Sequence, residues 1–314
     1  MEEQKQKPAS DVSSDKPPVP GETQSPPPAE TNHPTTSPPP TTDAKEKPRL
    51  LWSEKIGRPP YVLDPDDLPR DGMRRLDDTT IVKYGTQIQL AEAEAMHLVS
   101  TQTSIPTPKI EAAYVLDGRG FIVMSYEEGR GFAEYWEDAS EDEREGLIAQ
   151  LKDYVSQMRK IKGPFIGGVD GSACRDAVFA WDWKPDSHEY GPYKDQEELN
   201  EGLVRACRYC HPPNPDREKS SWWMTYQLAR SFKSKEIVFT HGDLHPGNMV
   251  VRDDGTVVLL DWGLSGYFPD YWEFYRATFN GAFREDFHPQ IERFVPPFYM
   301  EACALRQIFE RILG

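Results

Sequence analysis

The stretch Thr240–Gly263 reads THGDLHPGNMVVRDDGTVVLLDWG and is the most informative part of the chain. The apolar run that leads into it, Glu236–Thr240 (EIVFT), predicts a short buried strand. Two more strands are predicted at Met249–Arg252 and Thr256–Leu260, and the DDG sequence between them is a typical hairpin turn. The stretch therefore carries two polar loops at strand ends, where a rigid scaffold often holds chemically active residues.

Three side chains in these loops carry oxygen atoms at a distinctive spacing. Asp243 and Asn248 lie five positions apart in the first loop, and Asp261 directly follows the last strand. Such oxygen ligands suit Mg²⁺, and phosphoryl transfer depends mainly on positioning and on neutralised charge. Asp, Asn and Gly are also ordinary turn residues, but two such loops around one hairpin favour a catalytic role. The pattern predicts a site that orients a hydroxyl and holds Mg²⁺ with a nucleoside triphosphate.

The segment resembles the aminoglycoside phosphotransferase and choline kinase family, relatives of the protein kinases. In that family the catalytic loop reads H-x-D-x-x-x-x-N and the metal loop begins with Asp, and HGDLHPGN and DWG match both. The resemblance implies a two-lobed α+β fold of the protein-kinase type. Its N-lobe would hold a small antiparallel β-sheet and one helix, and its C-lobe would be mostly helical.

The resemblance also implies a role for each polar residue of the two loops. Asp243 would be catalytic and would orient or deprotonate the acceptor hydroxyl. Asn248 and Asp261 would be the metal ligands and would hold Mg²⁺. His241 and His245 would have structural roles in the loop.

A kinase also needs a Lys that holds the phosphates and a Glu that fixes this Lys. Thr79–Tyr84 (TTIVKY) predicts a strand that carries Lys83, and Gln87–Val99 predicts a helix from its Ala, Leu, Glu and Met content. We expect Glu92 to bind Lys83, because Glu92 shares an apolar helix face, with Glu94 as the second choice. Taken alone, a solvated Lys and a solvated Glu would explain the same pattern.

The next predicted strands form a second hairpin. Ile110–Leu116 and Phe121–Tyr126 flank an Asp-Gly turn at 117–118. The resemblance implies that the chain then leaves the small lobe through a hinge that binds the adenine. The nucleotide contacts expected there are Met124, Ser125 and Tyr126. Plain packing of a strand in the core is the alternative for all of them.

One part of the protein-kinase pattern is missing before Lys83. The stretch Asp71–Asp78 (DGMRRLDD) contains no G-x-G-x-x-G sequence to cover the phosphates. Members of the small-molecule kinase family often lack the full glycine motif, so this favours that branch over the protein kinases. It also leaves open how the phosphates are held.

The first 48 residues differ from the rest of the chain. They contain 12 of the 29 prolines and no Phe, Tyr or Trp. Such a segment buries too little apolar surface to offset its chain entropy, so we expect disorder at 1–48. An N-lobe is expected at 49–128 and a C-lobe at 129–314. Since no signal peptide and no long apolar run is visible, we expect a cytoplasmic protein that does not contact a membrane.

The charge of the chain bears on its partners. A net charge of −16 disfavours DNA or RNA, whose phosphates an acidic surface repels. It is compatible with a cationic small acceptor, although many acidic proteins need their charge only for solubility. A protein partner of the Pro-rich tail is possible, with an inert tail as the alternative.

The C-lobe gives a helix signal and a weaker acceptor signal. Ser140 and Glu143 predict a capping box, followed by apolar residues at helical spacing from 147 to 161. Within the segment 264–274 (LSGYFPDYWEF), residues 270–273 are similar to a segment that follows the metal loop in many fungal members of the family. Asp270, Trp272 and Glu273 are candidate acceptor contacts there, and helix capping explains them equally well.

The predicted function is an ATP-dependent O-phosphotransferase that acts on a hydroxyl of a small molecule, with Mg²⁺. A nucleotide-binding pseudokinase or scaffold, a protein kinase and a metallophosphatase are the alternatives. The last rests on Gly242–His245 (GDLH) and on Asp186–His188 (DSH), but the G-N-H-[ED] element that it needs is absent from the sequence. The acceptor, the oligomeric state and the choice of ATP or GTP stay open.

Overall fold

The structure is a computed structural model that describes residues 49–50, 63, 71–179, 190–210, 221–279 and 287–313. These residues all belong to one compact unit, Glu46–Gly314. The segment 1–48, for which the sequence predicts disorder, lies outside the described residues. Within the described part, no helix is long and apolar enough to cross a lipid bilayer.

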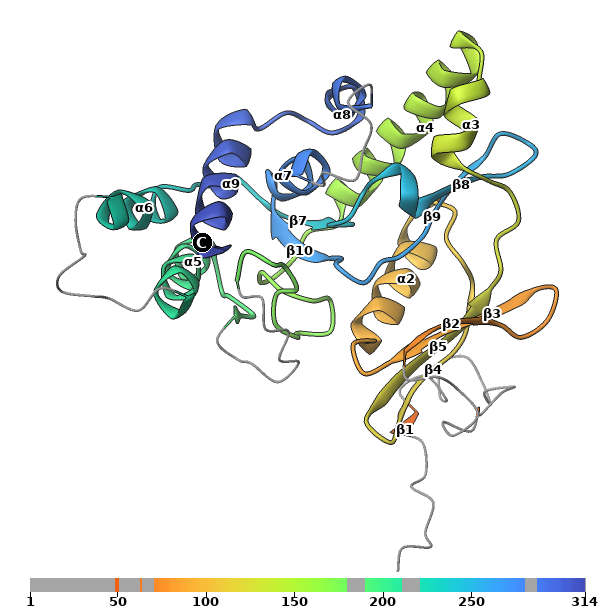
Figure 1. Ribbon diagram of the computed structural model, residues 1–314, viewed down its shortest axis with the longest axis horizontal. Helices are drawn as coiled ribbons and strands as arrows, with labels where there is room; N and C mark the ends of the chain where they lie inside the picture. The colour runs from red at the N-terminus through yellow and green to blue at the C-terminus, as the bar shows by residue number, and fades with distance from the viewer. Residues whose placement is uncertain are drawn as a thin grey trace, which may run out of the picture. The chain divides into compact units, whose positions relative to one another are not determined.

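A five-stranded antiparallel sheet forms the first part of the fold, in the order β1-β4-β5-β3-β2 (Figure 1). Its strands are β1 (Arg49–Leu50), β2 (Gly72–Arg75), β3 (Thr80–Gly85), β4 (Ile110–Leu116) and β5 (Arg119–Ser125). Asp117 and Gly118 join β4 to β5 with φ angles of 50° and 70°. Positive φ at both residues is the geometry of a tight hairpin turn, so the predicted second hairpin is confirmed.

The helix α2 (Leu90–Gln102) packs against β4 and β5 and lies beside the sheet in Figure 1. The sheet has apolar residues on both faces, because successive side chains of a strand point to opposite sides. Ala113 and Ile122 face a core that they share with Met96 of α2. Tyr114 and Phe121 belong to a second cluster, in which their rings stack 4.9 Å apart.

Seven further helices lie in the described part of the chain after the sheet. They are α3 (Phe132–Asp138), α4 (Glu141–Lys160), α5 (Gln196–Cys210), α6 (Ser221–Arg230), α7 (Trp272–Phe279), α8 (His288–Phe294) and α9 (Tyr299–Leu313). The N-terminus of α4 confirms the predicted capping box, since Oγ of Ser140 accepts from the N–H of Glu143 and the Glu143 carboxylate accepts from the N–H of Ser140. The apolar face of α4 is buried as its spacing predicts.

Two small sheets lie among these helices. One pairs β7 (Ile237–Thr240) with β10 (Gly266–Pro269), and the other has the order β6-β8-β9. Its strands are β6 (Arg130–Gly131), β8 (Met249–Val251) and β9 (Val257–Leu259). The predicted strands around the DDG turn are thus present. The strand β10 was not predicted, because the segment 264–274 has no alternating pattern and contains a Pro.

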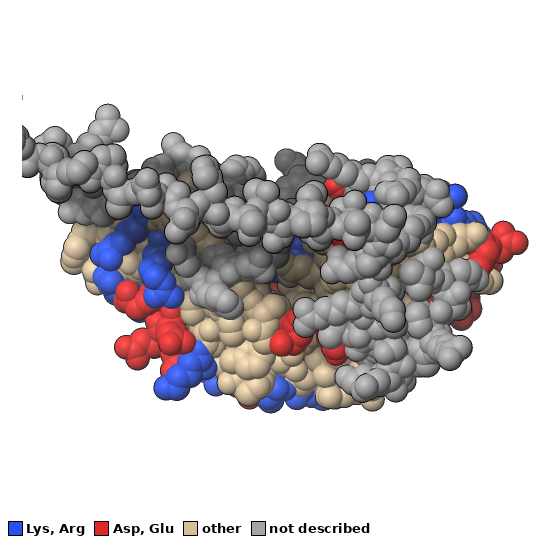
Figure 2. Space-filling view, turned by 90° about the horizontal axis from the view of Figure 1, so that it is seen from below, with Lys and Arg blue, Asp and Glu red and all other residues tan. Residues whose placement is uncertain are grey.

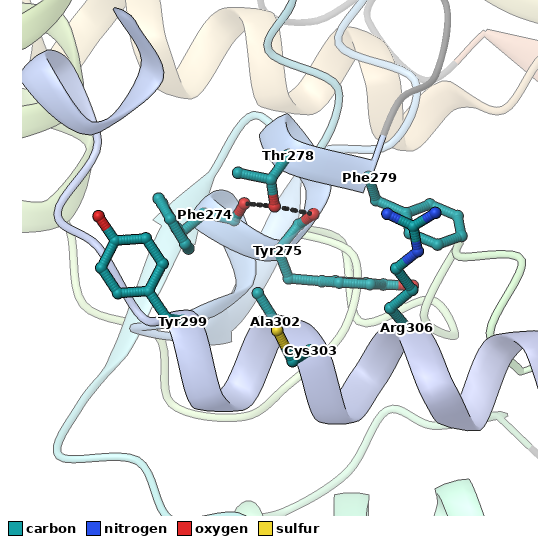
Figure 3. A pocket seen from close by; sticks show the side chains of 8 residues that line it. All are labelled: Phe274, Tyr275, Thr278, Phe279, Tyr299, Ala302, Cys303 and Arg306. Atoms are coloured by element: carbon teal, nitrogen blue, oxygen red, sulfur yellow. Dashed lines mark hydrogen bonds between the residues drawn. The ribbon is translucent and has the colours of Figure 1, made fainter. Parts of the chain in front are cut away.

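The helix α7 has two distinct sides. On one side it packs on α9 and borders a shallow groove of about 190 Å³ that is lined by residues of both helices (Figure 3). In this groove Oγ1 of Thr278 donates to the carbonyl oxygens of Phe274 and Tyr275. On another side, Glu273 and Arg276 of α7 bond to the backbone of the loop that follows β7. The helix thereby connects that loop to the helical core.

Charge is mixed among the coloured atoms of the face shown in Figure 2. On the face shown in Figure 2, Lys and Arg residues lie beside Asp and Glu residues among the atoms drawn in colour. Among the coloured atoms of this face, acidic residues therefore do not form a continuous surface.

Candidate active site

The first polar loop runs from the end of β7 to β8 and includes the short 3-10 helix η3 (Pro246–Asn248). The carbonyl oxygen of Asn248 accepts from the N–H of Leu260 at 2.9 Å. Because Leu260 precedes Asp261, this bond fixes the two polar loops side by side. The structure thus brings Asp243, Asn248 and Asp261 to one end of the β8–β9 hairpin.

Asp243 is surrounded by hydrogen-bond donors. The Nδ2 of Asn248 lies 3.0 Å from its Oδ2 and 3.1 Å from its carbonyl oxygen. The Nε2 of His245 lies 3.4 Å from the same Oδ2. Burial raises the pKa of Asp243, but the bond to His245 and the charge of Arg276 outweigh it and lower the pKa overall. The carboxylate is therefore ionised at neutral pH.

The contact of His245 with Asp243 depends on its tautomer. The Nδ1 of His245 accepts from the N–H of Gly247 at 3.0 Å. A neutral imidazole has one donor and one acceptor nitrogen, so the proton of neutral His245 is on Nε2, which faces Asp243. The sequence predicts a structural role for His245, and this geometry adds a direct contact with the candidate catalytic carboxylate.

His241 holds the loop from inside the protein. Its Nδ1 accepts from the N–H of Asp243 at 3.2 Å, and its Nε2 bonds to the carbonyl oxygen of Leu260 at 3.0 Å. Its ring packs on Trp262 with 4.4 Å between the ring centres. Complete burial lowers the pKa of His241 to about 4, so the ring is neutral.

Glu273 binds the start of the same loop. Its carboxylate accepts from the N–H groups of His241 and Gly242, at 2.6 and 3.2 Å. Gly242 has a φ of 76°, and a Cβ added there would lie 2.4 Å from the carbonyl oxygen of Leu264. Only glycine therefore fits this position without strain.

The sequence offered Asp270, Trp272 and Glu273 as acceptor contacts, and the structure places all three in the interior. Trp272 and Glu273 are 1% and 2% exposed. Asp270 is also buried, and its carboxylate accepts from the hydroxyl of Ser234. The acceptor interpretation is therefore wrong for these side chains, which support α7 and the loop after β7.

A chain of charges links the five-stranded sheet to the second polar loop. The Nζ of Lys83 on β3 lies 2.8 and 3.0 Å from the carboxylate oxygens of Glu92 on α2. The same nitrogen lies 2.8 Å from Oδ1 of Asp261. Burial lowers the pKa of Lys83, but the two carboxylates outweigh it and raise the pKa above its usual value. The alternative of a solvated Lys and Glu does not apply, because Glu92 is buried.

The backbone at Asp261 is unusual. Its φ of 55° lies in the left-handed region, which non-glycine residues seldom adopt. A Cβ added to Gly263 would lie 3.2 Å from Oδ1 of Asp261 and 3.3 Å from Oε2 of Glu92. The DWG sequence therefore permits a close approach of this loop to α2.

The donor set at the two loops fits a hard cation. The amide of Asn248 donates through Nδ2 to Asp243, so its Oδ1 can serve as a ligand. Burial raises the pKa of Asp261, but Lys83 outweighs it and lowers the pKa, so the carboxylate is charged. Carboxylate and amide oxygens are ligands that Mg²⁺ accepts. Among the described residues no group of three His, Cys, Asp or Glu side chains could hold a metal ion. The Asp186–His188 pair of the metallophosphatase alternative lies outside them.

The expected hinge residues already bond within the protein. The N–H of Ser125 donates to the carbonyl oxygen of Lys109, and the N–H of Tyr126 to that of Thr79. Met124 is buried in the core beside α2. A nucleotide contact at Ser125 or Tyr126 would therefore have to use carbonyl oxygens or side-chain atoms. The next residue, Glu127, bonds to Arg252 of the β8–β9 turn at 2.6 Å.

The stretch before Lys83, for which the sequence predicts no structure, contains a strand. Gly72–Arg75 forms the edge strand β2, which pairs with β3. Leu76 and Asp77 then donate to the carbonyl oxygen of Thr80 in the turn between the two strands. The segment 64–70, which precedes this strand, lies outside the described residues.

Some residues of the site carried no sequence signal. Arg175 donates to the carbonyl oxygens of Gly263 and Gln87, at 3.3 and 3.1 Å, and so joins the second polar loop to the segment before α2. Arg276 donates to the carbonyl oxygen of Gly242 at 2.9 Å. Their partners lie 34 to 88 positions away, so no local pattern could have identified them.

Comparison with known proteins gives one sequence match and several structural ones. Residues 86–295, more than half of the chain, match the phosphotransferase enzyme family. No curated protein sequence matches the chain.

The similar structures are distant ones. An aminoglycoside phosphotransferase from Streptomyces rimosus has 16% identity and a TM-score of 0.46, over 78% of this chain and 91% of that one. It has also been solved with ADP and streptomycin. A choline kinase from Streptococcus pneumoniae has 12% identity and a TM-score of 0.43, over 84% and 87% of the two chains. A macrolide 2'-phosphotransferase from Brachybacterium faecium has 10% identity and a TM-score of 0.44, over 73% and 74%.

Proposed function

Since the chain belongs to the phosphotransferase enzyme family, we propose that it transfers the γ-phosphate of ATP to a hydroxyl group of a small molecule. The acceptor oxygen forms a bond to the γ-phosphorus while the bond from that phosphorus to the β,γ-bridging oxygen breaks. ADP leaves, and the hydroxyl proton passes to solvent. The matched residues include both polar loops around the β8–β9 hairpin.

One observation carries this proposal. Lys83, Glu92 and Asp261 come from β3, α2 and the loop after β9, yet one ammonium group bonds to both carboxylates at 2.8 Å. Burying or half-burying three charges is costly unless they are paired. These three charged groups come from segments that are far apart in the chain, and they meet near Asp243 and Asn248. Such a cluster of charges supports phosphoryl transfer.

Each residue then has a role in this reaction. Lys83 binds the phosphates, and Glu92 fixes Lys83 in position. Asn248 and Asp261 hold Mg²⁺ through oxygen atoms. When bound, Mg²⁺ offsets the negative charge that repels the attacking oxygen. Asp261 contacts Lys83 directly in this structure, so its charge is already placed beside a cation.

Asp243 orients the acceptor hydroxyl more than it deprotonates it. Although burial raises the pKa of Asp243, the bond to His245 and the charges around it lower the pKa overall, and a strong base needs a pKa near the working pH. Phosphoryl transfer with a loose transition state needs little removal of the proton before the bond forms. A carboxylate that accepts the hydroxyl hydrogen and points its oxygen at phosphorus is sufficient.

The remaining parts of the proposal concern binding. The adenine would lie against Met124, Ser125 and Tyr126, between an N-lobe at 49–128 and a C-lobe at 129–314. The acceptor would be a small molecule, and the acidic charge of the chain is compatible with a cationic one. Streptomycin and choline are the first acceptors to examine, because similar structures carry these names.

The test is the rate of ADP formation by the full chain with Mg·ATP, alone and with each acceptor. We expect the native chain to form ADP and Asp243→Asn to lose at least about 100-fold in kcat, while it still binds Mg·ATP. Asn keeps the shape of the side chain but cannot hold a hydroxyl with the same charge. Equal rates in the two proteins would remove Asp243 from this role.

A further inference from the structure

Two charged residues near the candidate active site, one buried and one partly buried, have no role in the reaction described above. Asp176 lies between α4 and α5 in the chain, and its side chain is 1% exposed. Arg276 belongs to α7, and its side chain is 12% exposed. The Nε of Arg276 lies 3.4 Å from Oδ2 of Asp176. A buried ion pair is a weak source of stability, so its position next to Asp243 requires another explanation.

Two contacts at Nε hold the guanidinium of Arg276 in place. Its Nε donates to the carbonyl oxygen of Gly242 at 2.9 Å as well as facing Asp176. Asp176 is fixed in turn, because its Oδ1 accepts from the N–H of Val178 at 2.9 Å. The guanidinium is planar and rigid, so these contacts determine the direction in which its Nη2 points.

The other end of the guanidinium faces Asp243. Its Nη2 lies 3.5 Å from Oδ1 of Asp243. The second oxygen, Oδ2, is the one that Asn248 and His245 bind. Each oxygen of the carboxylate therefore has its own contacts, an ion pair with Arg276 at Oδ1 and the contacts with Asn248 and His245 at Oδ2. Contacts on both oxygens restrict rotation of the carboxylate plane.

We propose that Arg276, anchored by Asp176, is a positioning residue that fixes the carboxylate of Asp243 in the orientation needed to align the acceptor hydroxyl. The proposal rests on the proposed function. Arg276 acts through Asp243 and need not touch either substrate. A small misplacement of an aligned group can reduce the rate of a reaction by a factor of about 100, so the contact should affect kcat more than nucleotide binding.

The experiment compares Arg276→Met, Arg276→Lys and Asp176→Asn with the native full chain. The reaction is ADP formation from Mg·ATP with water as the acceptor, and Mg·ATP binding is measured separately by calorimetry. We expect kcat to fall by roughly 10- to 100-fold in Arg276→Met, with a change below about threefold in the KM for ATP. Arg276→Lys should fold and recover part of kcat, because it keeps a charge near Asp243 but loses the planar fork. Asp176→Asn should reduce kcat in the same direction.

The matched control is Arg159→Met. Arg159 donates to the carbonyl oxygen of Asp270, just before α7, and does not belong to the candidate site. Arg159→Met therefore disturbs the support of α7 without changing the surroundings of Asp243. A purely structural role of Arg276 predicts equal loss of kcat in Arg159→Met and Arg276→Met. That result would overturn the inference, as would native kcat in Arg276→Lys and Arg276→Met.

A crystal structure of Arg276→Lys separates this inference from the proposed function. If the native chain forms no ADP and phosphorylates no acceptor, the proposed function fails. The position of the Asp243 carboxylate still decides the structural part: we expect it to rotate away from its native position when the guanidinium is absent. An unchanged Asp243 in Arg276→Lys would contradict the positioning role, whether or not the native chain is active.

Discussion

The Nζ of Lys83 lies 2.8 Å from Oδ1 of Asp261, although 178 positions separate the two residues in the chain. The contact connects the five-stranded sheet to the loop after β9. In the proposed reaction, Lys83 binds phosphate oxygens and Asp261 holds Mg²⁺. Binding of Mg·ATP would then replace the ion pair between Lys83 and Asp261. The position of this pair therefore marks where the phosphates and Mg²⁺ would bind.

Removing Lys83 should leave Glu92 as a buried charge without its partner. The side chain of Glu92 is 2% exposed, and breaking a buried pair on one side costs about 3–5 kcal/mol. We expect Lys83→Met to lower the free energy of unfolding by about 3 kcal/mol and to abolish the Mg·ATP-dependent gain in stability. Urea denaturation with and without Mg·ATP measures both effects.

The control for this experiment is the double variant Lys83→Met, Glu92→Gln. Removing both charges eliminates the unpaired carboxylate, so the double variant should be more stable than Lys83→Met alone. It should still fail to gain stability from Mg·ATP. The single variant Glu92→Gln completes the comparison. If the stability lost in the double variant equals the sum of the losses in the two single variants, the residues do not act as a pair.

A side chain at Gly263 should crowd the carboxylates of Asp261 and Glu92. A Cβ there would lie 3.2 Å from Asp261 and 3.3 Å from Glu92. Overpacking of this kind costs about 1–3 kcal/mol and would displace the Asp261 carboxylate. We therefore expect Gly263→Ala to weaken Mg·ATP binding roughly tenfold, which corresponds to about 1.4 kcal/mol. Calorimetric titration with Mg·ATP provides the measurement.

Gly146→Ala is the matched change for Gly263→Ala. Gly146 lies in α4, and a Cβ there would have nothing within 4 Å. Alanine is the better helix former, so Gly146→Ala should raise stability by up to about 1 kcal/mol and leave binding unchanged. Equal affinities in the two variants would mean that Gly263 has no steric role at the site.

Glu273 should make the stability of the native chain fall as the pH rises through the acidic range. Burial raises the pKa of Glu273 to about 7, although the backbone N–H groups of His241 and Gly242 lower it. The unfolded chain releases this proton near pH 4.3, so between about pH 4.5 and 7 the folded state binds more protons and stability decreases with pH. The amide side chain introduced in Glu273→Gln does not titrate. The stability of this variant relative to the native chain should therefore rise across this window, by up to about 3 kcal/mol.

Urea denaturation at several pH values between 4.5 and 7.5 measures this difference. His241 contributes the opposite slope, because burial lowers its pKa to about 4 and stability falls as the pH drops below 6.5. Both proteins contain His241, so the difference between them isolates Glu273. Glu236→Gln is the control, since Glu236 is exposed and Lys162 lowers its pKa. Parallel curves for Glu273→Gln and the native chain would contradict the account.

The α+β fold class, with its antiparallel sheet and mostly helical second part, agrees with the sequence prediction. Short-range signals made this possible. The Asp-Gly turn at 117–118, the capping box at Ser140 and the hairpin around 253–255 each depend on a few neighbouring residues. The spacing of apolar residues also placed Glu92 on the buried face of α2.

Contacts between residues that are far apart in the chain could not be predicted from the sequence. Glu273 and Arg276 bond to residues 31 to 34 positions earlier in the chain, and their types alone do not distinguish them from surface residues of a helix. Asp270 and Trp272 were misread as acceptor contacts because burial follows from packing against distant segments. The edge strand β2 was not predicted, since its four residues are exposed and carry no apolar alternation.

The most direct test of the central claim is the thermal unfolding of the full chain with and without Mg·ATP, beside Asp261→Asn. A ligand at 100 times its dissociation constant adds about 2.7 kcal/mol to the stability of the folded state. The account predicts a gain of this size that requires both Mg²⁺ and ATP and that shrinks in Asp261→Asn. No gain in the native chain with Mg·ATP, or an equal gain in Asp261→Asn, would contradict a nucleotide site built on Lys83, Asn248 and Asp261.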